Sequence, residues 1–154
     1  FLVENAGEKR VAGIETMIRY QVGPVGGDLW HSYEYPFDGL PLYGSARHKL
    51  GVGGRYAYGE HWSLALRAKY TSRAIGQALD ADRDGIAISV PDYFTLDLNV
   101  LARNLVFAGV NWDVAFSTLN ILGKKNLYVN SFMPNPNSFL AEGREFFGRV
   151  TVRY

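Results

Sequence analysis

The sequence predicts an all-β fold, an antiparallel transmembrane β-barrel meander of about seven or eight strands that form part of a larger barrel. The clearest signal is the last stretch, Gly143 to Tyr154, where apolar or small residues recur at every second position up to the final aromatic residue. The predicted strands are about 9–12 residues long, whereas strands of soluble proteins average about 5–6. Short and long connections also alternate along the chain, as they do between the two ends of such barrels.

The first two predicted strands are Lys9 to Val22 and Asp28 to Tyr35. In the first, the residues from Ala12 to Tyr20 on one face are mostly apolar, and the opposite face carries charged and amide side chains. The glycine-rich segment between the strands, Gly23 to Gly27, is predicted as a short turn. His31 falls on the apolar face of the second strand, so we expect it near the boundary of the membrane.

The third and fourth predicted strands, His48 to Tyr58 and His61 to Ser72, are joined by a tight turn at Gly59 and Glu60. The fourth strand has Trp62 and Tyr70 at the ends of an otherwise aliphatic row. Two aromatic belts, one at each membrane interface, would produce this arrangement.

The remaining predicted strands are Asp92 to Arg103, Trp112 to Leu122 and the closing stretch, Gly143 to Tyr154, with a turn near Ala108 to Asn111. Phe1 to Glu4 is predicted as the tail of a preceding strand. Longer loops are predicted at Pro36 to Ala46, Ser72 to Val90 and Leu122 to Glu142.

The alternation also predicts which side chains meet lipid. A charge on the lipid face near the middle of the membrane costs about 2–4 kcal/mol, so charged rows belong inside. We expect Trp62, Leu64, Leu66, Leu96, Leu98, Val150 and Val152 to face lipid, and Arg67, Lys69, Asp97, Arg149 and Thr151 to face the interior. The interior cations, which include Arg55, Arg103 and Arg153, are expected to line a hydrated lumen and pair with Glu15, Glu34 and Asp97.

Composition excludes several classes of protein. The formal net charge of +1 gives no electrostatic case for binding nucleic acid. The chain has no cysteine, hence no disulfide and no thiolate metal site. Its longest apolar run, Leu105 to Val110, is far too short for a membrane helix. No motif joins a nucleophile to a base, so we expect no enzymatic activity.

One local motif suggests a metal. Asp80, Asp82 and Asp84 alternate before Gly85, as at the start of a calcium loop, and carboxylate oxygens suit calcium. The bidentate Glu of that loop is missing, because Pro91 stands at the twelfth position. Two interpretations therefore stay open: a weak calcium site formed by the three aspartates, or a solvated acidic loop tip.

Several segments together resemble the TonB-dependent outer-membrane receptors. The resemblance covers essentially the whole chain, residues 1–154, as the C-terminal part of the receptor barrel. The plug domain and energy-coupling box of such receptors have no counterpart in this chain. The segments are Asn5 to Gly7 with Gly13 to Glu15, Arg47 to Leu50, Pro91 to Leu98, Leu119 to Tyr128, and Gly143 to Phe147.

The resemblance implies active transport across the outer membrane of a Gram-negative bacterium. The cargo would be a scarce nutrient such as a ferric siderophore or cobalamin, and the TonB complex would supply energy through the plug. The implied partners are outer-membrane lipid, the TonB complex and the small-molecule nutrient, with no nucleic acid and no cofactor beyond the possible calcium. No ligand-binding residue can be assigned from the sequence. We also expect the closing strand to pair with a strand upstream of Phe1, because open sheet edges are not tolerated in hydrocarbon.

Two alternatives stay open. One is a small complete outer-membrane barrel with a structural or adhesive role. The other is a soluble β-barrel that binds a lipophilic ligand.

Overall fold

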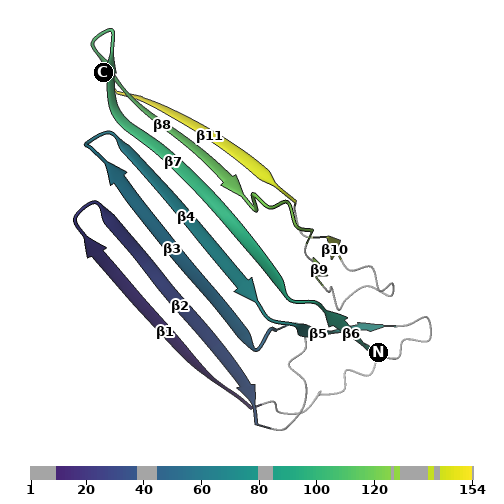
Figure 1. Cartoon of the computed structure of the whole chain (residues 1–154). Coiled ribbons are helices and arrows are strands. Elements are labelled where there is room, and N and C mark those ends of the chain that lie inside the picture. The colour runs from purple at the N-terminus through teal and green to yellow at the C-terminus, as the bar shows by residue number, and fades with distance from the viewer. Residues whose placement is uncertain are drawn as a thin grey trace.

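The computed structural model describes residues 10–37, 45–79, 85–125, 127–128, 139–140 and 143–153 (Figure 1). Seven strands form one antiparallel sheet in the order β1-β2-β3-β4-β7-β8-β11, which confirms the all-β meander. The strands are β1 (Val11–Val22), β2 (Val25–Pro36), β3 (His48–Tyr58), β4 (Trp62–Thr71), β7 (Tyr93–Phe107), β8 (Val110–Leu119) and β11 (Glu145–Arg153). The described part of the chain holds no helix of the length and hydropathy needed to cross a membrane.

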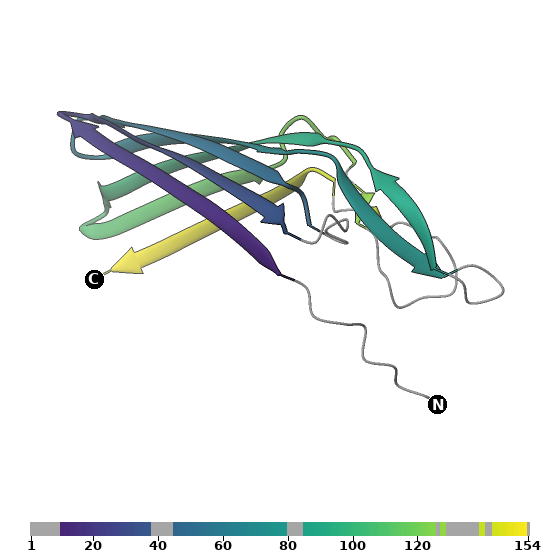
Figure 2. The ribbon, with the colours of Figure 1, turned by 90° about the horizontal axis from the view of Figure 1, so that it is seen from below.

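The sheet is curved. Figure 2 shows it as an arch in which the edge strands β1 and β11 both bend toward the same side. Among the described strands, β1 pairs only with β2 and β11 pairs only with β8, so the sheet has one concave face and two edges.

Three tight turns lie at one end of the sheet. Gly23 and Pro24 join β1 to β2, and Gly23 has a φ of +55°, as expected for a hairpin turn with glycine first. Ala108 and Gly109 join β7 to β8 with φ values of +53° and +77°, which is typical of a type I′ turn. Gly59, in the connection from β3 to β4, also has a positive φ.

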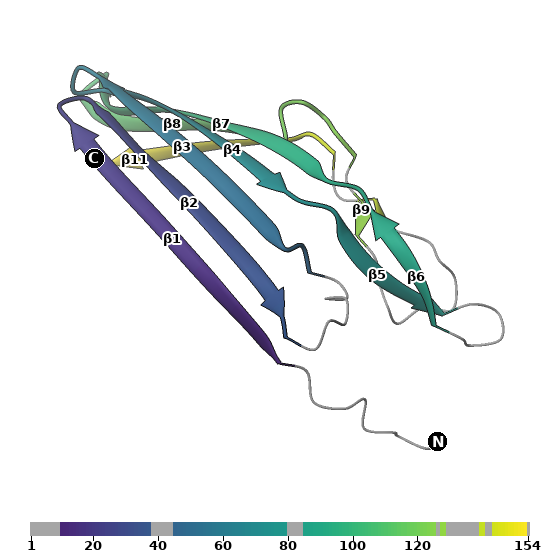
Figure 3. The same ribbon diagram turned by 60° about the horizontal axis from the view of Figure 1, so that its bottom comes forward.

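The predicted loop Ser72 to Val90 is wrong in part, because it contains the hairpin β5 (Ala74–Leu79) and β6 (Gly85–Val90). The hairpin continues β4 and β7 beyond the end of the main sheet (Figure 3). Pro91 has no backbone N–H, so the ladder is interrupted before β7. On the other side of β4, Ser72 donates its backbone N–H to the carbonyl oxygen of His48, which extends the pairing of β4 with β3 by one residue.

Other boundaries also differ from those predicted. β2 begins at Val25, so the predicted turn Gly23 to Gly27 is two residues long, and Gly26 and Gly27 belong to the strand. β7 runs on to Phe107 through a bulge, and β8 ends at Leu119. The described part of the segment predicted as the last long loop also holds the short pair β9 (Leu127–Tyr128) and β10 (Phe139–Leu140). Phe1 to Glu4 lies outside the described residues.

The bulge in β7 has a clear hydrogen-bonding cause. Arg103 and Asn104 together oppose the single residue Asp113 of β8. Asn104 adopts a left-handed conformation with a φ of +51°, and its backbone N–H donates to the carboxylate of Asp113 over 2.9 Å. Asp113 also forms an ion pair with Arg153 of β11, so one carboxylate connects three strands.

The convex face is apolar and bounded by aromatic residues. Apolar residues of neighbouring strands lie opposite one another, for example Leu66 opposite Leu98. This register confirms that the residues predicted to face outward share one face. Near the tight turns this face carries Tyr20, Tyr56, Tyr58, Trp62 and Trp112, and near the opposite end it carries Tyr33, Tyr35, Tyr70, Phe94 and Phe146. Between these two belts the aliphatic side chains of Val52, Leu66 and Val150 are 52%, 44% and 60% exposed, so no described residue covers them.

Candidate functional site

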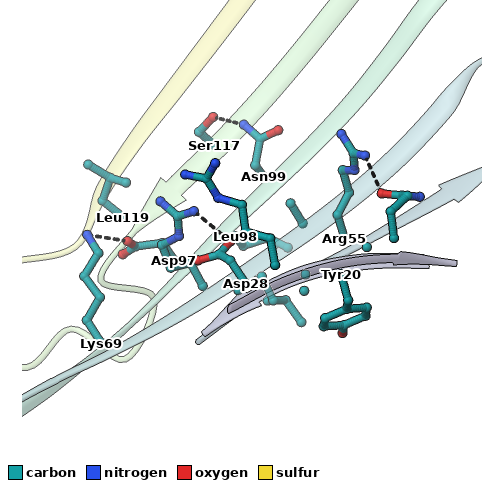
Figure 4. A pocket seen from close by; sticks show the side chains of 18 residues that line it. Tyr20, Asp28, Arg55, Lys69, Asp97, Leu98, Asn99, Ser117 and Leu119 are labelled. Carbon is teal, nitrogen blue, oxygen red and sulfur yellow. Dashed lines mark hydrogen bonds and ion pairs between the residues drawn. The ribbon is translucent and has the colours of Figure 1, made fainter. Parts of the chain in front are cut away.

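The concave face of the sheet is a polar wall. It lines a concavity of about 840 Å³, to which residues of β1, β2, β3, β4, β7 and β8 contribute (Figure 4). Its charged members are Arg19, Asp28, Arg55, Arg67, Lys69 and Asp97. Cations and anions lie opposite one another on neighbouring strands in this wall, as Arg67 and Asp97 do.

Two ion pairs lie at the centre of the wall. The guanidinium of Arg67 on β4 donates to the carboxylate of Asp28 on β2 over 3.2 Å. The ammonium of Lys69, also on β4, lies 3.3 Å from the carboxylate of Asp97 on β7. Arg67 and Asp97 are directly opposite each other in the strand register. Positive and negative groups thus alternate across β2, β4 and β7.

The ion pair between Arg67 and Asp28 reaches across an intervening strand, and a glycine leaves the room for it. β3 lies between Asp28 and Arg67, and the residue opposite both of them is Gly53. A Cβ atom on Gly53 would lie 2.6 Å from the carboxylate oxygen of Asp28, which is closer than real contacts allow. The absence of a side chain on Gly53 therefore lets the ion pair span three strands.

In the next row of the wall, another glycine of β3 leaves room for an aromatic side chain. The indole of Trp30 on β2 lies against Gly51 of β3, in the position that a Cβ atom of Gly51 would occupy. Gly51 and Gly53 are both buried. We call Gly51 and Gly53 the glycine trough of β3. The indole of Trp30 and the carboxylate of Asp28 lie over this trough.

Nearer the tight turns the wall is more cationic. Arg55 donates to the side-chain oxygen of Gln21 over 3.0 Å, so its hydrogen-bond partner is a neutral amide. Arg149 forms no ion pair with any residue that the structure describes, and neither does Arg19, although it lies directly opposite Asp28 in the strand register. This end of the wall would therefore attract acidic groups.

The opposite end of the wall is held by a polar cluster. The ammonium of Lys49 lies 3.0 Å from the carboxylate of Glu34, and the hydroxyl of Ser45 donates to the same carboxylate over 2.7 Å. This cluster connects the end of β2 to the start of β3.

The sequence predicted the wall residues better than their partners. Arg67, Lys69, Asp97, Arg149 and Thr151 share the concave face, as expected. Of the acids expected to pair with the interior cations, Asp97 pairs with Lys69, one of the expected cations, and Glu34 pairs with Lys49, which was not among them. Arg67 pairs with Asp28, which was not among the expected acids. Arg103 lies in the bulge of β7, and Glu15 forms no ion pair with a described residue.

Asn120 is a structural residue that the sequence pattern did not reveal. It is 7% exposed and adopts a left-handed conformation immediately after β8. Its backbone N–H donates to the carboxylate of Asp97 over 2.9 Å, and its side-chain amide donates to the carbonyl oxygens of Lys124 and Gly143 over 2.7 and 3.4 Å. Asn120 thus fixes both ends of the segment that leads from β8 to β11.

The calcium hypothesis is not tested by the structure, because Asp80, Asp82 and Asp84 lie outside the described residues. Within the ranges that the structure does describe, no three His, Cys, Asp or Glu side chains come together as a metal site. Calcium binding at the three aspartates stays a prediction.

Comparison with known proteins gives one match. A protein-family model described as "TonB dependent receptor-like, beta-barrel" matches residues 1–127. This range contains every strand of the main sheet except β11, which continues the same sheet by pairing with β8. No curated protein and no solved structure matches the chain.

Proposed function

The chain belongs to the TonB-dependent receptor-like β-barrel family, and from this premise we propose that it forms part of the barrel of an outer-membrane receptor that imports a scarce nutrient. The family consists of outer-membrane transport receptors of Gram-negative bacteria rather than enzymes. The proposed cargo is a ferric siderophore, cobalamin or a similar small molecule, and the proposed energy source is the TonB complex acting through a plug domain.

The observation that carries this proposal is the division of one sheet into an apolar convex face and a charged concave face. The convex face has an aromatic belt at each end and aliphatic side chains between them. Lipid would cover this face at no cost, because hydrocarbon replaces water around apolar side chains. The concave ion pairs Arg67–Asp28 and Lys69–Asp97 need water or a polar partner.

The same observation argues against a soluble barrel. A soluble β-barrel turns its apolar face inward and encloses it. Here the concave, enclosing face is the charged one, and the apolar face points outward. At its centre the wall is also a surface along which a polar solute can move, because Arg67 and Lys69 are already paired with Asp28 and Asp97.

The two sheet edges are part of the proposal. In hydrocarbon, the unpaired N–H and C=O groups on the outer sides of β1 and β11 would cost several kcal/mol each, by general estimates for buried polar groups. We propose that further strands of the same barrel pair with both edges.

An import assay tests the proposed function. The intact protein is produced in a Gram-negative strain that lacks uptake of the probes, and accumulation of iron-55 siderophore complexes and labelled cyanocobalamin is measured with and without functional TonB. We expect one probe to accumulate only when both the protein and TonB are present. Accumulation that persists without TonB, or recovery of the protein in the soluble fraction, would contradict the proposal.

A further inference from the structure

An imidazole pair on the convex face lies outside the wall described above. Nε2 of His31 on β2 is 3.2 Å from Nδ1 of His48 on β3, and the ring planes are inclined by 15°. One ring donates N–H and the other accepts, so the two nitrogens point toward each other. The pair lies at the level of the aromatic belt furthest from the tight turns, beside Tyr33.

This distance matches the spacing of two ligands on one metal ion. Zinc binds histidine nitrogen at about 2.0–2.1 Å with tetrahedral geometry, so two such nitrogens lie about 3.3 Å apart. When the donor ring carries its proton on its other nitrogen instead, and both rings rotate, the two free lone pairs can point at one metal ion. Imidazole nitrogen suits zinc, copper and nickel, whereas magnesium and calcium prefer oxygen.

The surroundings hold the pair in place. The ring of Tyr33 packs on His48 with centroids 4.7 Å apart. The backbone N–H of His48 donates to the hydroxyl of Ser72 over 3.0 Å, and Ser72 in turn donates its backbone N–H to the carbonyl oxygen of His48. Because the two histidines come from adjacent paired strands, little chain entropy is lost when they bind one ion.

We propose that His31 and His48 form a two-histidine binding site for a divalent transition-metal ion of the zinc and copper class. Two coordination positions stay open to water or to phosphate oxygens at the membrane surface. The bound ion ties β2 to β3 beside the connection between them, and it stabilises this end of the barrel in proportion to its occupancy.

Chemical modification with site resolution tests the proposal on the unsubstituted, intact protein folded in detergent or bilayers. Diethyl pyrocarbonate modifies accessible histidine nitrogens, and mass spectrometry reports each histidine separately. We expect Zn²⁺ to protect His31 and His48 with the same midpoint and Mg²⁺ to protect neither. His61 is the internal control, because it lies alone at the tight-turn end with its Nδ1 2.9 Å from the carbonyl oxygen of Arg103. Modification of His31 and His48 that is unchanged by Zn²⁺ would overturn the proposal.

Calorimetry with matched variants gives a second readout. His31→Asn and His48→Asn should each weaken Zn²⁺ binding at least tenfold and remove one equivalent of tight binding, while His61→Asn should leave it unchanged. Equal stoichiometry and affinity in the His31→Asn/His48→Asn double variant and the unsubstituted protein would also overturn the proposal. If a variant fails to fold, the protection experiment decides alone, because it needs no substitution.

Discussion

Replacing Gly53 with valine should destabilise the folded barrel, whereas replacing its neighbour Gly54 with valine should not. The two glycines are adjacent on β3, but their side-chain positions lie on opposite faces of the sheet. A Cβ atom on Gly53 meets the carboxylate of Asp28, and a Cβ atom on Gly54 meets no atom within 4 Å. The pair therefore separates the effect of the wall contact from the general effect of valine in a strand.

The magnitude follows from what the Gly53→Val side chain would displace. The carboxylate of Asp28 must move, which breaks its 3.2 Å contact with Arg67. Because the side chains of Arg67 and Asp28 are 53% and 22% exposed, solvent screens the ion pair and its loss costs only about 0.2–1 kcal/mol. Overpacking adds about 1–3 kcal/mol. Valine has a higher strand propensity than glycine by up to about 1 kcal/mol, which offsets part of this cost at Gly53 and is gained in full at Gly54.

We therefore expect Gly53→Val to be less stable than Gly54→Val by about 1–4 kcal/mol, from overpacking and the lost ion pair. The assay is the urea dependence of the free energy of unfolding for the intact protein in lipid bilayers, followed by tryptophan fluorescence. Equal stabilities for the two variants would show that the Asp28–Arg67 ion pair does not depend on the absence of a side chain at Gly53.

Three further predictions concern the ends of the strands. Asn120→Ala should lower the free energy of unfolding by about 1–3 kcal/mol, because it removes the donor to the carbonyl oxygens of Lys124 and Gly143 and places Ala in a left-handed conformation. Asn111→Ala, at an exposed position, should change it by less than about 0.5 kcal/mol, and equal effects would contradict the role of Asn120. Ala108→Asn should raise the free energy of unfolding by about 0.5–1 kcal/mol, since Asn tolerates the left-handed conformation of a type I′ turn, and a lower thermal midpoint would refute this. Asp113→Ala should accelerate hydrogen exchange at the amide of Asn104 at least tenfold, and unchanged exchange would show that the carboxylate does not hold the bulge.

The strands were predictable because alternation is a local property of the sequence. The run of Trp62, Leu64 and Leu66 against Ser63, Ala65 and Arg67 needs no knowledge of neighbouring strands. The prediction failed at the start of β2, where Gly26 and Gly27 were assigned to a turn. Gly27 pairs with Tyr20 of β1, whose ring fills the space that a side chain on Gly27 would need, and a pattern based on single residues cannot show that contact.

The partners in the wall were less predictable than its faces. Pairing Arg67 with Asp28 requires the register of three strands and the knowledge that Gly53 leaves room between them. The role of Asn120 depends on carbonyl groups 4 and 23 residues away in the chain. The hairpin β5–β6 did carry a signal, since Ile86, Ile88 and Val90 alternate, but the acidic segment before them favoured a loop.

The proposed function requires that the convex face of the sheet meets lipid and that the concave face meets water. The 154 residues contain no cysteine, so single-cysteine variants along β4 can each carry one spin label. Labels are placed in turn from Ser63 to Ala68 in the intact protein in bilayers, and collisions with oxygen and with a water-soluble nickel chelate are measured. We predict that oxygen accessibility peaks at Leu64, Leu66 and Ala68, with nickel accessibility peaking at the residues between them. Accessibility without a period of two, or nickel contact at Leu66 as high as at Ala65, would contradict the account.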